Sequence, residues 1–240
     1  MTALGTVAAI AGRMFRRAPL IAPAPHIVQV TGMVPQAGLC TVNLCVPQLM
    51  QEILGGVDLK DNPHLELPTR IDAEGRMLRL LADDLSPLKP DGAHFIFRMH
   101  LKSLMSAGFI AFERAHGAAL RGRLTVSVPV TEAIADEDAA AFAVNYLGSR
   151  GAGFAVHGLT LPAIARMPEN VQGFFSTAKY LGLILARADL ALSEKERLAA
   201  AQAVMRLSRA RLIASTGGDE ALAAIARDCG IVMIEGRSGL

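Results

Sequence analysis

Hydrophobic and polar positions alternate along this chain with two periods, most regularly in its second half. Short apolar runs of roughly four to eight residues are typical of buried strands. They are followed by segments in which apolar residues recur every three or four positions, the period of an amphipathic helix. The clearest unit runs from Arg211 to Gly236: an apolar strand, a polar turn, a helix, Gly230 and a second apolar strand. The pattern favours a parallel sheet covered by helices.

The same reasoning places elements along the whole chain. Strands are predicted at His26–Val30, Leu39–Leu44, Leu65–Ile71, His94–Met99, Leu124–Val130, Phe154–Val156, Leu183–Ala188, Arg211–Ala214 and Ile231–Ile234. Helices are predicted at Gln48–Leu54, Ala73–Leu85, Ser106–Leu120, Asp136–Arg150, Ser193–Ser208 and Asp219–Cys229. A count of about seven or eight strands matches a closed (β/α)8 TIM-like barrel, and a doubly wound open sheet is the alternative.

Composition fits one large α/β domain. The chain has 240 residues, of which 52% are hydrophobic and 19% charged, so it can bury a substantial core. We expect residues 1–24 to be an N-terminal tail or helix and residues 25–240 to be the barrel domain. Prolines at 19, 23 and 25 mark this boundary.

The N-terminal segment is basic, because no Asp or Glu precedes Glu52 while Arg13, Arg16 and Arg17 follow an apolar stretch. A transit peptide or a membrane-surface helix would look similar. A secretory signal would carry its positive charges before the apolar run, so an ordinary helix or tail is favoured.

Charge, hydropathy and cysteine content limit the classes of partner and the cellular compartment that fit this sequence. A net charge of +2 gives no electrostatic argument for a nucleic-acid partner. No apolar run reaches the roughly 18–20 residues of a transmembrane segment. Cys40, Cys45 and Cys229 lack zinc-site spacing, and so few thiols suit a reduced, cytoplasmic protein.

Reactive side chains in a parallel barrel lie at the carboxyl ends of the strands. Those ends read Met99-His100, Ser127-Val128-Pro129, His157-Gly158, Arg187-Ala188-Asp189, Ser215-Thr216 and Glu235. The set contains one Asp and one Glu, whereas a site for two divalent ions needs several converging carboxylates. We therefore expect neither a metal site nor a cofactor.

Taken in order, these segments resemble the EAL-domain family of cyclic-di-GMP phosphodiesterases, over roughly Glu66 to Gly236. The family's Glu-Ile-Thr-Glu strand falls on Ser127–Val130, its Asp-Asp-Phe-Gly on His157–Thr160, its Lys-Ile-Asp on Arg187–Asp189, its Ala-Glu-Gly-Val-Glu on Ala214–Gly218 and its Gln-Gly on Glu235-Gly236. The signature Glu-Ala-Leu-x-Arg is placed on Glu66–Arg70.

The departures from the family pattern concern its catalytic set. His157-Gly158 replaces the metal-binding Asp pair, and Ser127 and Ser215 replace two Glu residues. Arg187 is placed where the family has its catalytic Lys, and Arg98 where it has Asn. An arginine stays protonated and is planar, so it is a poor substitute for that lysine.

The resemblance thus implies a degenerate, catalytically inactive EAL-type barrel that serves as a regulatory module in bacterial signalling through protein partners. It also implies a homodimer. The alternatives are a receptor that binds cyclic-di-GMP through Arg70 and Arg187 without cleaving it, and a hydrolase with an unusual metal set. The candidate vestigial ligand-binding residues are Glu66, Arg70, Arg187, Asp189 and Glu235. A pair of Arg187 with Glu235 or Asp189, left after the loss of catalysis, is the simpler interpretation.

Exposed Met and Phe side chains on the helices are candidate contact surfaces. They are Met99, Met105, Phe109, Phe112 and Met205, although packing in the core is the commoner use of these residue types.

Other signals have simpler explanations. Thr216-Gly-Gly-Asp-Glu220 looks like the GGDEF signature of diguanylate cyclases, but a strong helix former follows it, so we predict a helix-entry turn. His94, His100 and His157 lack the carboxylates that usually support a metal-binding histidine. Ser127 and Ser215 lack the motif of a serine hydrolase.

Overall fold

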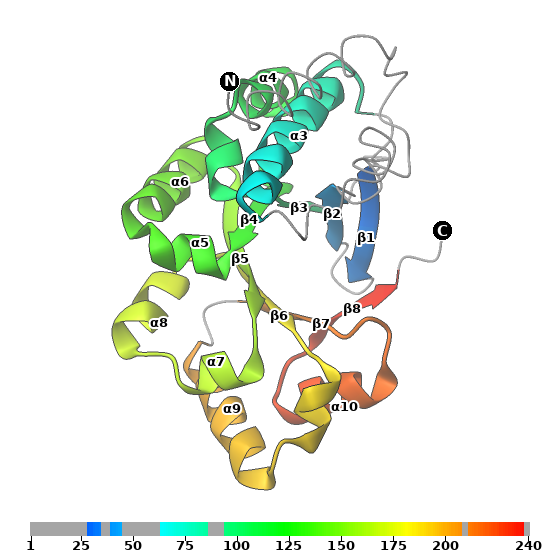
Figure 1. The fold of residues 1–240 in the computed structure, drawn as a ribbon, viewed down its shortest axis with the longest axis vertical. Helices are drawn as coiled ribbons and strands as arrows, with labels where there is room; N and C mark the ends of the chain where they lie inside the picture. Colours follow the sequence, from blue (N-terminus) through cyan, green and yellow to red (C-terminus); the bar gives the residue numbers. More distant parts are fainter. Residues whose placement is uncertain (1–27, 35–38, 45–62, 86–93, 208–210, 238–240) are drawn as a thin grey trace. The chain divides into compact units, whose positions relative to one another are not determined.

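The structure, a computed structural model, describes residues 28–34, 39–44, 63–85, 94–207 and 211–237 (Figure 1). The chain divides into two compact units. The larger consists of residues 30–42, 92–101 and 120–240, and the smaller includes residues 43–91 and 102–119. The boundary expected after residue 24 lies outside the described residues, as do Cys45 and the helix expected at Gln48–Leu54.

The strands form a closed barrel in chain order, and this confirms the predicted barrel over the open sheet. They are β1 (Val28–Val34), β2 (Leu39–Leu44), β3 (His94–Arg98), β4 (Leu124–Pro129), β5 (Gly153–Leu159), β6 (Tyr180–Ile184), β7 (Arg211–Ser215) and β8 (Met233–Arg237). Strands β2 to β8 pair in parallel. Strand β1 instead pairs antiparallel with β8, an orientation that the sequence pattern did not predict.

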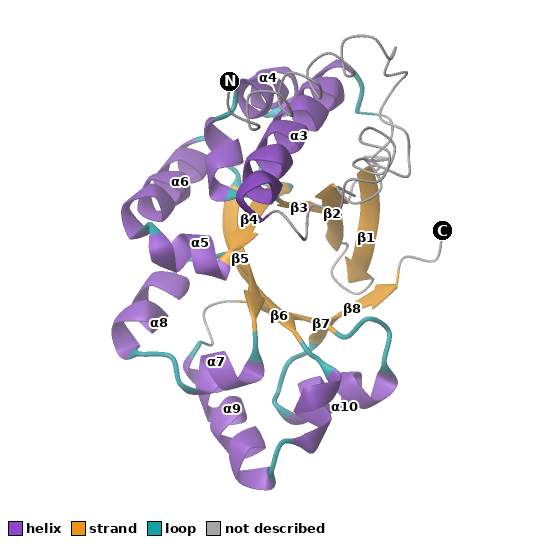
Figure 2. Cartoon of the chain, viewed as in Figure 1, coloured by secondary structure: helices purple, strands orange, loops and turns teal. Residues whose placement is uncertain are grey.

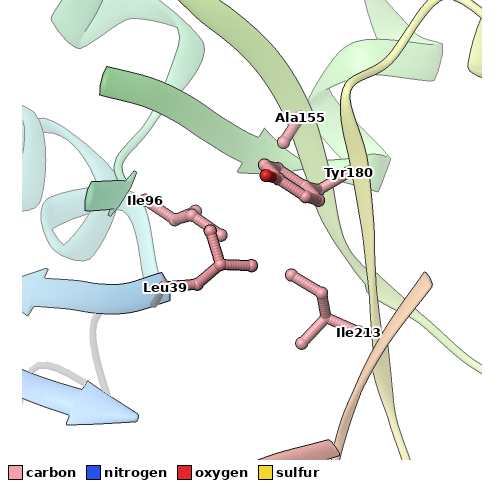
Figure 3. Packing of buried hydrophobic residues seen from close by; sticks show 5 residues of the cluster. All are labelled: Leu39, Ile96, Ala155, Tyr180 and Ile213. Carbon is pink, nitrogen blue, oxygen red and sulfur yellow. The ribbon is translucent and has the colours of Figure 1, made fainter. Parts of the chain in front are cut away.

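An apolar cluster lies in the barrel interior. Figure 3 shows its five side chains, which converge from five strands: Leu39, Ile96, Ala155, Tyr180 and Ile213. Met233 of β8 packs against them. All five cluster side chains are almost fully buried, so their packing fixes which face of each strand points inward.

Helices follow most strands, as the predicted βα alternation requires (Figure 2). They are α3 (Pro63–Asp83), α4 (Ala107–His116), α5 (Val130–Ala135), α6 (Glu137–Ser149), α7 (Leu161–Ala165), α8 (Glu169–Phe175), α9 (Glu194–Arg206) and α10 (Glu220–Asp228), with 3-10 turns η4 (Leu101–Met105) and η5 (Arg187–Ala191). Helices α5 and α6 pack against β5, and α7 packs against α9.

Three predicted helix starts are confirmed by their caps, whereas the helix predicted to begin at Ala73 begins at Pro63. Asp136 accepts a hydrogen bond from the backbone N–H of Ala139 at 3.0 Å, and Ser193 forms a reciprocal capping box with Glu196. Asp219 caps α10, so Thr216–Glu220 is a helix-entry turn as predicted, with Gly217 and Gly218 at positive φ.

Two strand predictions are wrong. Residues 65–71 belong to helix α3, which tolerates Pro68 although this residue lacks the N–H of one helical hydrogen bond. The strand placed at Leu183–Ala188 is β6, three residues earlier. Its apolar run continues past the last pairing residue, Ile184, so hydrophobicity alone does not mark the end of the strand.

In the smaller unit, α3 and α4 pack against each other at two glycines. A Cβ atom added to Gly108 would lie 1.7 Å from the carbonyl oxygen of Gly75. The buried Ser103 hydroxyl donates to Glu74 at 2.5 Å, and His116 Nε2 contacts the Leu81 carbonyl at 3.0 Å. Among the helices of the described residues, none is long and apolar enough to cross a membrane.

Candidate functional site

Beyond the apolar cluster, toward the carboxyl end, the inward face continues with one more residue on six of the parallel strands. Because side chains alternate between faces, these are the residues two positions after each cluster member. They are Thr41, Arg98, His157, Gly182, Ser215 and Glu235, and Ser127 of β4 joins them by its contact with His157. We call these seven the mouth residues. They include one cation, Arg98, and one carboxylate, Glu235.

Arg98 and Glu235 form an ion pair between β3 and β8. Nη2 of Arg98 lies 3.1 Å from Oε2 and 3.3 Å from Oε1 of Glu235. The Glu235 side chain is 5% exposed and that of Arg98 is 22% exposed. These strands are not neighbours in the barrel, since β1 and β2 lie between them. The pair therefore compensates a buried negative charge and joins two non-adjacent strands.

Ser127 and His157 form the second contact of the mouth. Oγ of Ser127 lies 3.1 Å from Nδ1 of His157. Burial lowers the pKa of His157 to about 3, with further lowering by the nearby charges of Arg98 and His100, whereas a hydrogen bond with the backbone of Ser127 raises it. His157 is consequently neutral at pH 7, and the mouth holds no net charge from it.

Glu132 of α5 holds the chain just after β3. Its Oε2 accepts a hydrogen bond from the backbone N–H of Leu101 at 2.7 Å. Its Oε1 lies 3.7 Å from Nε2 of His100. This carboxylate is thus engaged by the turn that leaves β3, next to Arg98 in sequence.

The candidate ligand-binding residues named from sequence are dispersed. Glu66 and Arg70 lie on α3 of the smaller unit and pair with each other at 2.8 Å. Arg187 is exposed on η5, and Asp189 is buried there, where it accepts a hydrogen bond from the N–H of Ala186 at 2.8 Å. Glu235 is the one member at the mouth.

Two of these placements need correction. Arg187 follows β6 instead of ending it, and β6 carries Gly182 at its inward position. The expected pairing of Arg187 with Glu235 or Asp189 is replaced by Arg98 with Glu235 and by the backbone contact of Asp189. Arg98 was noted only as a departure from a motif. Two-residue alternation along β3 is the signal that places it inward.

The barrel has a counterpart among solved structures. The EAL domain of FimX from Xanthomonas citri, in complex with c-diGMP, matches with a TM-score of 0.61 at 11% identity, over 97% of this chain and 92% of that one. PaMucR phosphodiesterase, in a c-di-GMP complex, matches with a TM-score of 0.56 at 14% identity, over 94% of each chain. This chain has the EAL-domain fold.

A longer protein of this fold also matches. BlrP1 of Klebsiella pneumoniae, in a manganese/cy-diGMP complex, gives a TM-score of 0.56 at 15% identity, over 87% of this chain. The match spans about half, 53%, of the length of BlrP1. No family model and no curated protein matches the sequence.

The manganese named for BlrP1 raises the question of whether this EAL-like mouth fits a divalent ion. Hard cations need several oxygen ligands, and paired ions need shared carboxylates. Among the mouth residues only Glu235 is a carboxylate, and both of its oxygens contact Arg98. The described residues contain no group of three His, Cys, Asp or Glu side chains that could hold a metal. This donor set does not fit a pair of divalent ions.

Proposed function

We propose that this chain is an EAL-like regulatory module that does not hydrolyse cyclic dinucleotides and acts through protein partners. The observation that carries the proposal is the ion pair of Glu235, the one carboxylate among the mouth residues, with Arg98. A metal-dependent phosphodiesterase needs acidic ligands to offset the charge of its ions. Glu235 alone supplies one negative charge, and Arg98 already neutralises it.

A hydrolysis assay tests the proposal directly. The full chain is incubated with cyclic-di-GMP in excess Mn²⁺ or Mg²⁺, and linear product is separated by chromatography. We expect no product above the rate without protein, while PaMucR phosphodiesterase under the same conditions supplies the positive control. Turnover by the wild type that disappears in Glu235→Gln would overturn the proposal.

Ligand binding without cleavage is the second candidate, because the FimX EAL domains that share this fold have structures in complex with c-di-GMP. Isothermal titration with cyclic-di-GMP, with and without Mg²⁺, separates this role from a pure interaction module. Micromolar binding would establish a receptor. Absence of binding heat at millimolar cyclic-di-GMP would favour a pure interaction module.

Contact with protein partners is supported by exposed apolar side chains. Met105 is 61% exposed, and Leu198 and Met205 of α9 are 60% and 66% exposed. Leu198 and Met205 are seven residues apart and therefore share one face of α9. Met99, Phe109 and Phe112, which the sequence also suggested for contacts, are buried and belong to the core.

The α9 face provides a matched experiment. Affinity capture from the native host is compared between the wild type and a Leu198→Glu/Met205→Glu variant. A partner that binds through α9 is lost from the variant but retained by Phe142→Glu, a change at an exposed position of α6. Light scattering on the same preparations tests the expected homodimer.

A further inference from the structure

Arg98 is held in place by a single nitrogen. Both contacts with Glu235 use Nη2, although a guanidinium carries five N–H donors in a planar fork. Nε and Nη1 lie outside this ion pair. The Arg98 side chain is 22% exposed and that of Glu235 is 5% exposed, so Arg98 is the more accessible member of the pair.

The residues near Arg98 include hydrogen-bonding groups besides Glu235. Ser127 is the register partner of Arg98 across β3 and β4. Its hydroxyl contacts His157, which is neutral at pH 7 because its pKa is lowered to about 3. Two hydrogen-bonding groups therefore accompany the Arg98–Glu235 ion pair at the mouth.

A planar cation with spare N–H donors matches the oxygens of phosphate or carboxylate groups. We infer that Arg98 is a tethered cation that binds a phosphate-type oxyanion at the barrel mouth, in place of the divalent ions that the donor set does not fit. Glu235 positions the guanidinium, and Ser127 adds a hydroxyl beside it. This inference rests on the proposed function, since it concerns the same mouth in a protein that does not cleave its ligand.

Metal-free binding to inorganic phosphate is the first measurement. Phosphate is titrated into the full chain in excess chelator at constant ionic strength, and binding is followed by calorimetry and ³¹P line broadening. We expect millimolar binding by the wild type that weakens about ten-fold or more in Arg98→Met, because charge-assisted hydrogen bonds are lost. Arg206→Met removes an exposed arginine of α9, outside the mouth, and is expected to bind like the wild type.

A second arm identifies the source of the oxyanion. Cyclic-di-GMP replaces phosphate in the same chelator-containing buffer. If cyclic-di-GMP binds and Arg98→Met weakens that binding, the oxyanion is assigned as a phosphodiester. If only inorganic phosphate shows this dependence on Arg98, the oxyanion is assigned as a free phosphate. Both results support the inference. Binding that Arg98→Met leaves unchanged, or no binding of either probe, would contradict it.

Loss of Arg98 leaves Glu235 buried without its cation, so the single variant risks misfolding. The Arg98→Met/Glu235→Gln variant removes both charges and keeps the test valid, with circular dichroism as the check on folding. The two proposals fail separately. Formation of linear product with Mn²⁺ would contradict the non-hydrolysing function. Absence of metal-free binding by the wild type, without any product formation, would contradict only the role of Arg98.

Discussion

At the scale of single residues, the charges at the mouth are coupled in pairs. Arg98 and Glu235 lie 137 positions apart in sequence and meet at 3.1 Å. Removing one partner of a buried ion pair costs about 3–5 kcal/mol, whereas replacing both charges together is often close to neutral. The fractional exposure of Arg98 places the expected effect toward the lower end of that range.

A double-mutant cycle tests this coupling. We expect Arg98→Met to lower the free energy of unfolding by about 3 kcal/mol, because Glu235 then remains buried without compensation. Glu235→Gln, and Arg98→Met combined with Glu235→Gln, should each cost less than the single arginine variant. Urea unfolding of the three variants and the wild type measures the cycle. Additive losses would mean that the two side chains do not interact in solution.

His157 predicts a pH dependence of stability. Its folded-state pKa of about 3 lies below its ordinary value of 6.5, because burial disfavours the charged ring. The unfolded chain therefore binds the proton first. Stability from this residue is complete above about pH 6.5 and is lost as the pH falls toward 3, by at most about 5 kcal/mol.

The measurement is urea unfolding between pH 4 and pH 7.5. His157→Gln should flatten the acid side of this profile relative to the wild type, and ring resonances of His157 should show no titration near pH 6.5. A ring that titrates there in the folded protein would refute the assignment.

At the scale of elements, the α3–α4 crossing depends on a missing side chain. A Cβ at Gly108 would overlap the Gly75 carbonyl at 1.7 Å, and backbone cannot yield as a flexible side chain can. Gly108→Ala should lower the unfolding free energy by about 2–4 kcal/mol, as overpacking against rigid atoms does.

Gly148 of α6 is the matched control, since an added Cβ there meets nothing within 4 Å. Gly148→Ala should instead stabilise the protein by about 0.5–1 kcal/mol through helix propensity. Thermal melts of the two variants give opposite shifts. Equal shifts would mean that the helices do not cross at these glycines.

Local sequence signals account for the elements that were predicted correctly. Asp136, Ser193 and Asp219 are hydrogen-bonding caps whose effect extends over three residues, so they mark helix starts without tertiary information. Residues 65–71 were assigned to a strand because Leu and Ile surround Pro68. Packing of α3 against α4 in the smaller unit overrides that preference.

The site was less predictable than the fold, because its contacts cross the barrel. Two-residue alternation gives the inward side chains of each strand, but it does not give which of them meet. The contact between Arg98 and Glu235 could not be predicted without knowing that strands β1 to β8 close into a barrel. Arg187 was misplaced since the end of β6 is set by pairing with Ser215 of β7 and has no polar residue to mark it.

At the scale of the whole molecule, the scarcity of acidic side chains at the mouth predicts that divalent ions do not change the stability of the protein. A ligand that binds only the folded state raises its stability by RT ln(1 + [L]/Kd). With no fitting donor set among the described residues, 1 mM Mn²⁺ or Mg²⁺ should shift the melting temperature by less than about 1 °C relative to chelator, since a ligand far below its Kd stabilises by well under 1 kcal/mol. Arg98→Asp, which places two carboxylates at the mouth, should gain a shift that Glu235→Gln abolishes.

The antiparallel pairing of β1 with β8 also bears on how the chain reaches its native state. Gly32 and Met33 pair with Arg237 and Gly236, so the seam joins segments about 200 positions apart in sequence. Closure of the barrel requires that β8 has been synthesised, and such distant pairings slow folding. Deleting residues 233–240 removes β8 together with Met233 and Glu235 and should yield an open, aggregation-prone sheet edge, even though the apolar cluster of β2, β3, β5, β6 and β7 keeps all five of its side chains.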